Sequence, residues 1–99
     1  MEYEITTTEV FSKWAAKLKD RQAAKAITTR LIRASNGNLG DVEPVGDGVS
    51  EMRIFVGKGY RVYFTIRDRR LIILLNGGDK SSQQRDIRRA KKILNELEG

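Results

Sequence analysis

Three strand-like runs joined by two very short turns lie in the second half of the chain, and they constrain its fold more than any other feature. SEMRIFV (50–56) and YRVYFTI (60–66) alternate side chains with the period of two that a β-strand has. GKG (57–59) and DRR (68–70) are short enough to join antiparallel neighbours. LIILL (71–75) is apolar at every position, as in a strand covered on both faces. These runs predict a three-strand antiparallel meander.

Helical spacing of apolar residues marks three further segments. The pattern runs through FSKWAAKLKD and RQAAKAITTRLIRASNGN, with a break between them at Asp20. Asn36 and Gly37 are signals for the end of the second helix. One of the threonines in 6–8 is expected to cap the first helix. The short break predicts a helical hairpin. QRDIRRAKKILNELEG predicts a last helix with one apolar face and a basic face toward solvent.

The remaining segments complete the order of elements. YEITTT (3–8) is expected to form a short edge strand, and GNLGDVEPVGDG (37–48), with four glycines and the only proline, is expected to be a loop. The predicted fold class is α+β: an N-terminal strand and a helical hairpin on an antiparallel sheet, then a C-terminal helix. With 99 residues and no boundary or repeat, we expect a single domain, 1–99.

Two missing residue types narrow the possible chemistry. The chain has no cysteine, which excludes disulfides, thiol nucleophiles and thiolate metal sites, and no histidine, the commonest metal ligand. The carboxylates lack the spacing of a calcium loop, so we expect neither a metal nor another cofactor. No apolar run approaches the roughly 20 residues that span a bilayer. The acidic, polar residues 1–9 do not resemble a secretory signal, so we expect a cytoplasmic protein.

The net charge of +6 is concentrated in the second half of the chain. Residues 1–51 hold seven Lys or Arg and eight Asp or Glu, a balance of −1, whereas residues 52–99 hold twelve and five, a balance of +7. A half-chain this basic favours a polyanionic partner, with nucleic acid ahead of membrane, over a merely solvated basic surface.

Strand parity brings two arginines and two aromatic residues together. If the alternate residues of each run face the core, Arg53, Phe55, Arg61 and Tyr63 share the opposite face. Arginine binds phosphate as a fork and aromatic rings stack on bases, so this set is typical of a platform for RNA or single strands. The alternative is structural, because such residues are common on exposed strand faces and Phe55 can pack under the last helix.

Lys80 follows the last strand, in the segment GGDKSS that leads into the last helix. An anion is favoured at a helix N-terminus, where backbone N–H groups are unpaired. The segment lacks the GxxxxGK[ST] spacing of a nucleotide-binding loop. We expect the glycines to form the turn, and Ser81 with Gln84 to form a capping box, although Asp79 is an alternative cap.

In combination these motifs resemble the RelE/ParE superfamily of type II toxin–antitoxin toxins, and specifically its HigB-like branch of addiction module killer proteins. The similar segments are FSKWAAKLKD, RLIRASNGNLGDVEPVGDGVSEMRI, GKGYRVYF and ILLNGGDKSSQQRDIRRA. They cover most of the chain in order, from about Phe11 to about Ala90.

The resemblance implies a small, basic toxin of the bacterial cytoplasm with a microbial RNase-like fold. It implies a cognate antitoxin, often a helix-turn-helix protein, as its partner. RelE-like members act at the ribosome and cut mRNA without a metal, by attack of the mRNA's own 2′-hydroxyl on the adjacent phosphate. Basic side chains orient the RNA and stabilise the developing charge.

Residue by residue, the resemblance implies a basic catalytic set. Arg61 would stabilise the phosphate, Arg53 would assist or position it, and Lys80 would contact phosphate or transfer a proton. Four further residues are predicted to contact RNA, the two tyrosines by stacking on bases: Lys58, Tyr60, Tyr63 and Gln83. The alternative for Gln83 is a purely structural role.

The chain departs from this pattern in its proton-transfer groups. Many superfamily ribonucleases carry a His or Tyr near the C-terminus as acid or base, and this chain has no His and no Tyr after Tyr63. ParE-type relatives share the fold but inhibit DNA gyrase. A gyrase-type toxin and an inactive RNA-binding remnant therefore stay open as alternatives to an mRNA endonuclease.

Overall fold

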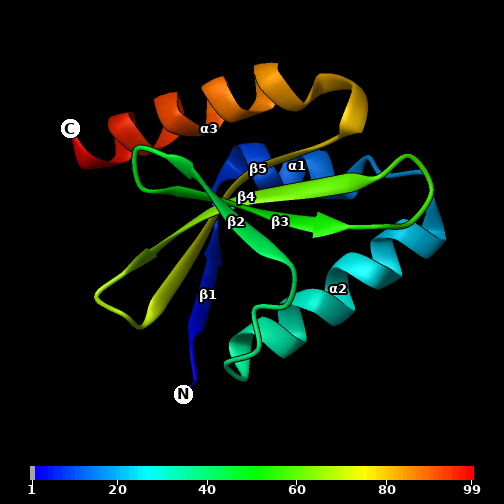
Figure 1. Ribbon diagram of the computed structural model, residues 1–99, viewed down its shortest axis with the longest axis horizontal. Helices are drawn as coiled ribbons and strands as arrows, with labels where there is room; N and C mark the ends of the chain where they lie inside the picture. Colours follow the sequence, from blue (N-terminus) through cyan, green and yellow to red (C-terminus); the bar gives the residue numbers. More distant parts are fainter. Residues whose placement is uncertain (1) are drawn as a thin grey trace.

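One five-stranded sheet with helices on both faces forms the protein, whose structure is a computed structural model that describes residues 2–99 (Figure 1). In chain order the elements are β1 (Glu4–Thr7), α1 (Glu9–Ala16), α2 (Arg21–Ser35), β2 (Val42–Gly46), β3 (Val49–Ile54), β4 (Tyr60–Arg67), β5 (Leu71–Asp79), a 3-10 turn η1 (Lys80–Ser82) and α3 (Gln83–Glu98). The α+β class predicted from the sequence is confirmed.

The strands lie in the order β1-β5-β4-β3-β2. β2 to β5 form an antiparallel meander, and β1 pairs with β5 in parallel, from Glu4 opposite Leu71 to Thr7 opposite Leu74. The predicted meander of β3, β4 and β5 is thus confirmed. The register sets Arg53 opposite Arg61, and Arg61 opposite Gly78, in one row across three strands.

Each face of the sheet is covered by its own helices. On the face under α1 and α2 the buried cluster includes Met52, Val62, Phe64 and Leu74 together with residues of both helices. On the opposite face Val49, Tyr63, Ile73, Leu75, Ala90 and Leu94 pack under α3. β5 contributes to both clusters, which confirms that this apolar strand is covered on both sides.

The segment 37–48 is not the loop expected from its composition, because β2 forms within it. β2 is an edge strand paired with β3, and Pro44 is tolerated there because an edge strand leaves N–H groups without ladder partners. Asp47 and Gly48, with φ of 55° and 81°, make the tight turn between the two strands. An Asp-Gly pair is a strong hairpin signal. The composition of the surrounding segment outweighed that signal in our prediction.

The passage from β5 to α3 also differs from expectation. β5 continues through Gly77 and Gly78 to Asp79, so the glycines belong to the strand rather than to a turn. The alternative cap, Asp79, holds η1 by accepting a hydrogen bond from the Ser81 N–H at 2.8 Å. The predicted Ser81–Gln84 capping box is wrong, because α3 begins at Gln83 after Ser82, which makes no capping hydrogen bond from its side chain. Thr8 caps α1.

Candidate active site

Arg61 is the most firmly held of the predicted catalytic cations. Its side chain is 11% exposed, its Nη1 donates to the Gly59 carbonyl at 2.9 Å, and its Nε lies 3.6 Å from Oε2 of Glu51. Glu51 is itself buried and accepts a hydrogen bond from Nε2 of Gln83 at 2.9 Å. The guanidinium is therefore fixed on the α3 face before any substrate arrives. Strand parity predicted the position of Arg61 but not the carboxylate beneath it.

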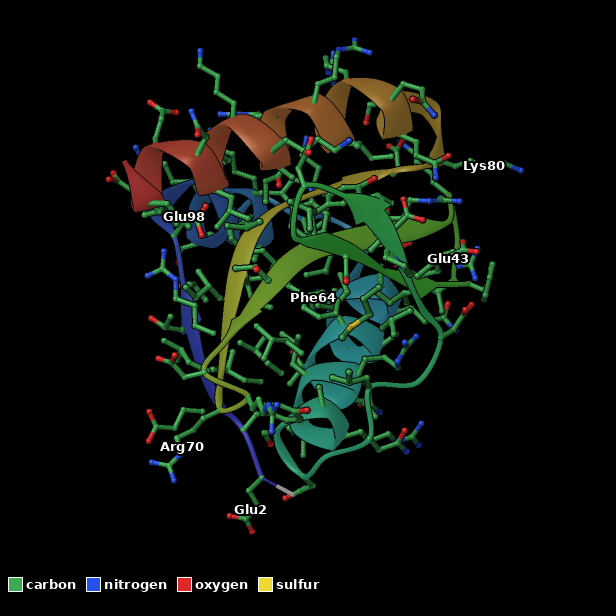
Figure 2. All side chains as sticks on the ribbon, turned by 60° about the vertical axis from the view of Figure 1, so that its left-hand side comes forward. Glu2, Glu43, Phe64, Arg70, Lys80 and Glu98 are labelled. Carbon is green, nitrogen blue, oxygen red and sulfur yellow. The ribbon has the colours of Figure 1, made fainter. Side chains whose placement is uncertain are left out.

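Lys80 lies next to Arg61, on the other side of Gly59. A Cβ built on Gly59 would stand 3.6 Å from Nη1 of Arg61 and 3.6 Å from Cβ of Lys80, so the two side chains flank this glycine. Lys80 is exposed, and its side chain extends away from the body of the protein (Figure 2). An exposed ammonium beside a fixed guanidinium is a suitable arrangement for binding a phosphate.

Arg53 is already engaged by two carboxylates. Its guanidinium bonds to Oδ1 of Asp41 at 2.8 Å and to Oε2 of Glu43 at 2.9 Å. The hydrogen bond to Asp41 raises the pKa of Arg53 above its ordinary value. Because these two carboxylates already offset its charge, Arg53 is better suited to hold the start of β2 than to be the main contact of a phosphate.

The predicted aromatic platform does not form. Tyr63 is fully buried under α3, and burial, followed by the nearby charge of Glu51, raises the pKa of its hydroxyl. Tyr60 is 7% exposed, with its ring centroid 6.5 Å from that of Trp14. Burial leaves no room for a base to stack on Tyr63 in this structure, whereas Tyr60 lines an open cavity beside Trp14 and its contact with RNA stays a prediction. Phe55 is 76% exposed but lies beyond the end of β3, in a groove beside α2.

The other two predicted RNA contacts occupy different environments. Lys58 is exposed in the turn between β3 and β4, and it lines a shallow cavity with Lys80, Asp79 and Ser81. Gln83 is partly buried and hydrogen-bonded to Glu51, which supports the structural alternative for this residue. The structure thus brings Lys58 close to Lys80.

Residues 2–99 also bear on two other kinds of site, a metal site and a membrane-spanning helix. No group of three or more potential metal ligands comes together in this part of the chain. Within the same residues, none of the helices combines the length and apolar character needed to cross a membrane.

Comparison with solved structures shows the same fold in known toxin–antitoxin complexes. A chain of the RelBE2 toxin–antitoxin complex from Mycobacterium tuberculosis superposes with a TM-score of 0.63 and 20% identity, over 81% of this chain and 100% of that chain. A chain of the intact RelBE complex from E. coli gives 0.61 and 15%, over 78% and 95%. At these identities the likeness is one of fold.

Two sequence comparisons give the family. An uncharacterized protein of Haemophilus influenzae is 46% identical over 97 residues, which cover 98% of each chain. The family model described as phage derived protein Gp49-like (DUF891) matches residues 9–98. The chain therefore belongs to the phage-derived Gp49-like family and has the fold of chains in RelBE toxin–antitoxin complexes.

Proposed function

We propose that this protein is the toxin of a type II toxin–antitoxin system, of the HigB-like branch, and a ribosome-dependent, metal-independent endonuclease of mRNA. The observation that carries the proposal is the pair formed by Arg61 and Lys80 on either side of Gly59. This pair lies on a fold that superposes on chains of two RelBE complexes. In this proposal the protein acts in the bacterial cytoplasm, and its partners are mRNA, the ribosome and a cognate antitoxin.

The proposed reaction needs stabilisation of charge more than a covalent group from the protein. The 2′-hydroxyl releases its proton to solvent water as its oxygen forms a bond to the adjacent phosphorus. The bond from phosphorus to the 5′-oxygen breaks and that oxygen takes up a proton, which leaves a 2′,3′-cyclic phosphate and a 5′-hydroxyl. Negative charge grows on the phosphoryl oxygens during attack. The guanidinium of Arg61, fixed by Gly59 and Glu51, offers donors that need no reorganisation at that moment.

Lys80 has the second role. It contacts a phosphoryl oxygen, and an ammonium that holds a proton near the leaving 5′-oxygen is able to donate it as that bond breaks. Arg53 acts as a positioning residue in this scheme, because its ion pairs with Asp41 and Glu43 tie β2 to the strand beside Arg61.

Controlled expression in a bacterial host tests the proposal. The wild type should arrest growth, stop translation and create new mRNA 5′ ends, whereas Arg61→Ala should abolish all three. Arg70→Ala, which removes an exposed arginine from the turn between β4 and β5, is the matched control and should stay toxic. Growth arrest with intact mRNA, or with gyrase-dependent DNA breaks, would contradict the proposal.

A further inference from the structure

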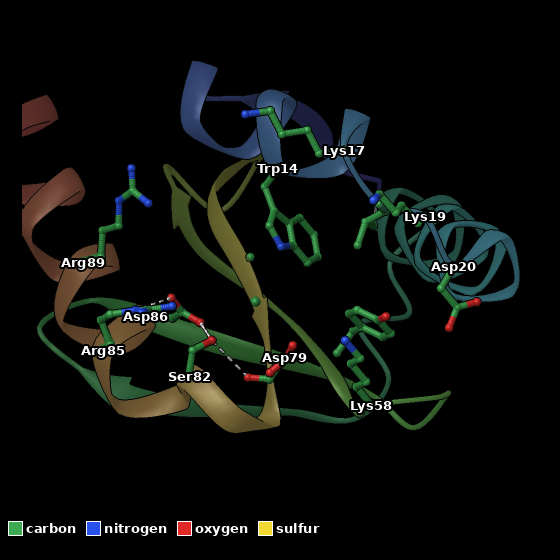
Figure 3. A pocket seen from close by; sticks show the side chains of 14 residues that line it. Trp14, Lys17, Lys19, Asp20, Lys58, Asp79, Ser82, Arg85, Asp86 and Arg89 are labelled. Carbon is green, nitrogen blue, oxygen red and sulfur yellow. Dashed lines mark hydrogen bonds and ion pairs between the residues drawn. The ribbon is translucent and has the colours of Figure 1, made fainter.

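A groove follows the edge of β5 where β1 no longer covers it. β1 pairs with β5 only as far as Leu74, and beyond that point the strand edge lies between α1 and α3 (Figure 3). An open cavity of about 680 Å³ occupies this space, and a neighbouring cavity of about 490 Å³ shares Trp14, Lys17, Gly77 and Arg89 with it. We call these two cavities together the edge groove.

The walls of the edge groove rest directly on two residues without side chains. A Cβ at Gly77 would come within 2.3 Å of the Trp14 ring, and a Cβ at Gly78 within 1.9 Å of the Asp86 carboxylate. Only glycine lets both walls approach the strand this closely. Gly77 and Gly78 thus line the groove between Trp14 on one side and Asp86 on the other.

Cations line the groove from three directions. Lys17 and Lys19 come from the end of α1 and the segment after it, Lys58 from the β3–β4 turn, and Arg85 and Arg89 from α3. A sixth cation, Lys13 of α1, lines the neighbouring cavity and is paired there with Glu9 at 2.9 Å. Among residues 2–99 only Arg85 of the other five has a carboxylate within 4 Å, and that contact, to Asp86, is 3.9 Å long. The groove thus holds a cluster of positive charge that the protein itself leaves largely unpaired.

The carboxylates of the same cavity are already hydrogen-bonded to groups of the protein. Asp20 accepts from the Ala23 N–H at 3.1 Å as the cap of α2, Asp79 accepts from the Ser81 N–H at 2.8 Å, and Asp86 accepts from the Ser82 hydroxyl. These carboxylates hold helix ends and turns in place through their hydrogen bonds. The carboxylates keep their negative charge, but the six lysines and arginines of the groove outnumber its four carboxylates, so the groove favours an anionic ligand.

The groove is continuous with the proposed active site. Lys58 lines both the edge groove and the shallow cavity that contains Lys80. A chain of phosphates that leaves Lys80 can therefore pass Lys58 and enter the groove between Lys17 and Arg89. Positively charged grooves that follow a backbone are the usual means of binding single strands without reading sequence.

We propose that the edge groove binds the phosphodiester backbone of single-stranded RNA beside the phosphate held by Arg61 and Lys80. The choice of RNA rests on the proposed function, since unpaired cations accept any polyanion. The groove extends the contact with the strand well beyond the reacting phosphate. Its contribution is affinity and alignment rather than chemistry.

The single tryptophan of the chain makes a local test possible, because Trp14 lines the groove. The probe is a 2′-O-methylated RNA of about ten nucleotides, within the site sizes of single-strand binders, and it cannot undergo 2′-oxygen attack. Titration into the purified protein should change Trp14 fluorescence saturably. The double variant Lys17→Ala/Arg89→Ala should weaken binding about 10-fold or more and lower the slope of log affinity against log salt by about 1.4.

Two controls separate the groove from its neighbours. Lys25→Ala/Arg70→Ala removes one exposed lysine and one exposed arginine that do not line the groove, and it should bind within about 2-fold of wild type. Arg61→Ala should keep the Trp14 response even though it loses cleavage, so failure of the catalytic proposal would leave this result intact. RNA binding without a Trp14 response, or equal losses in the two double variants, would overturn the edge groove proposal.

Discussion

The two faces of the sheet differ in the polarity of the side chains that they bury. Under α1 and α2 the buried cluster contains only apolar and aromatic residues. On the α3 side four polar residues are buried as well: Glu51, Thr65, Asn76 and Asp86. Among residues 2–99, buried polar atoms without a hydrogen-bond partner include the Tyr63 hydroxyl, Oδ1 of Asn76 and Nε of Arg61, all on the α3 side.

The difference indicates what each face is for. Burying a polar group is unfavourable unless it finds a partner, so a face that buries four polar residues is harder to stabilise than one that buries only apolar residues. This face also carries Arg61 and its support, Glu51. Unsatisfied polar groups at such a place are typical of a functional site, and we therefore expect substitutions on the two faces to behave differently.

The largest effect is expected from truncation on the apolar face. Phe64 is 1% exposed within the cluster under α1 and α2, so Phe64→Ala should lower the free energy of unfolding by about 3–5 kcal/mol. Urea denaturation followed by circular dichroism measures this change. A loss below about 1 kcal/mol would show that this face is not the main source of stability.

Substitution of the adjacent glycines Gly77 and Gly78 compares the two faces most directly, because a side chain added at each would lie on a different face of the sheet. Gly77→Ala meets Trp14 on the α1 side, and Gly78→Ala meets Asp86 on the α3 side. Each should cost about 1–3 kcal/mol, since something must shift to admit the methyl group. Thermal melts give the cost, and Trp14 fluorescence in the native state should change in Gly77→Ala far more than in Gly78→Ala. Equal spectra would contradict the assignment of faces.

Tyr63→Phe should leave the free energy of unfolding almost unchanged or raise it, whereas the preceding variants lower it. It removes a buried hydroxyl that lies near Glu51 without a hydrogen bond of normal geometry, and it keeps the ring under α3. We expect a change within about 1 kcal/mol, neutral or stabilising. The same denaturation experiment tests this, and a loss above about 2 kcal/mol would reveal a hydrogen bond that the hydroxyl makes in solution.

The smallest effect concerns acid stability. Hydrogen bonds from the Ser81 hydroxyl and N–H lower the pKa of Asp79, so the folded protein binds this proton more weakly than the unfolded chain. The ionised carboxylate therefore stabilises the fold above its unfolded pKa, about 4, and this contribution is lost as pH falls through the lower folded pKa. Asp79→Asn should flatten the fall of Tm between about pH 5 and pH 3. An unchanged pH profile would count against the η1 cap.

Periodicity predicted most of the fold because it reports burial directly. The alternation in β3 and β4 and the apolar run in β5 match their faces in the structure. β2 was missed because an edge strand takes its hydrogen bonds from its neighbour, so its own composition need not be strand-like. Only the Asp-Gly turn signal at Asp47 and Gly48 indicated β2 in the sequence.

Parity predicted which residues share a face but not what covers that face. Arg53, Arg61 and Tyr63 do lie on the side opposite Val62 and Phe64, yet α3 buries Tyr63 while Arg61 stays at the margin. The apolar face of α3 was expected to pack on the sheet, but the sequence pattern did not indicate which face of the sheet it would cover. The support of Arg61 by Glu51 depends on cross-strand packing, which no local pattern records.

Cleavage of mRNA on purified ribosomes is the most direct test of the central claim that Arg61 and Lys80 form an endonuclease site. Wild type and Arg70→Ala should cut ribosome-bound mRNA at the same rate in the presence of a chelator for trace metals. Arg61→Ala should be slower by about 10²-fold or more, the usual cost of losing a charge-stabilising donor. Uncut mRNA with the wild type, or an Arg61→Ala variant as fast as wild type, would contradict the account.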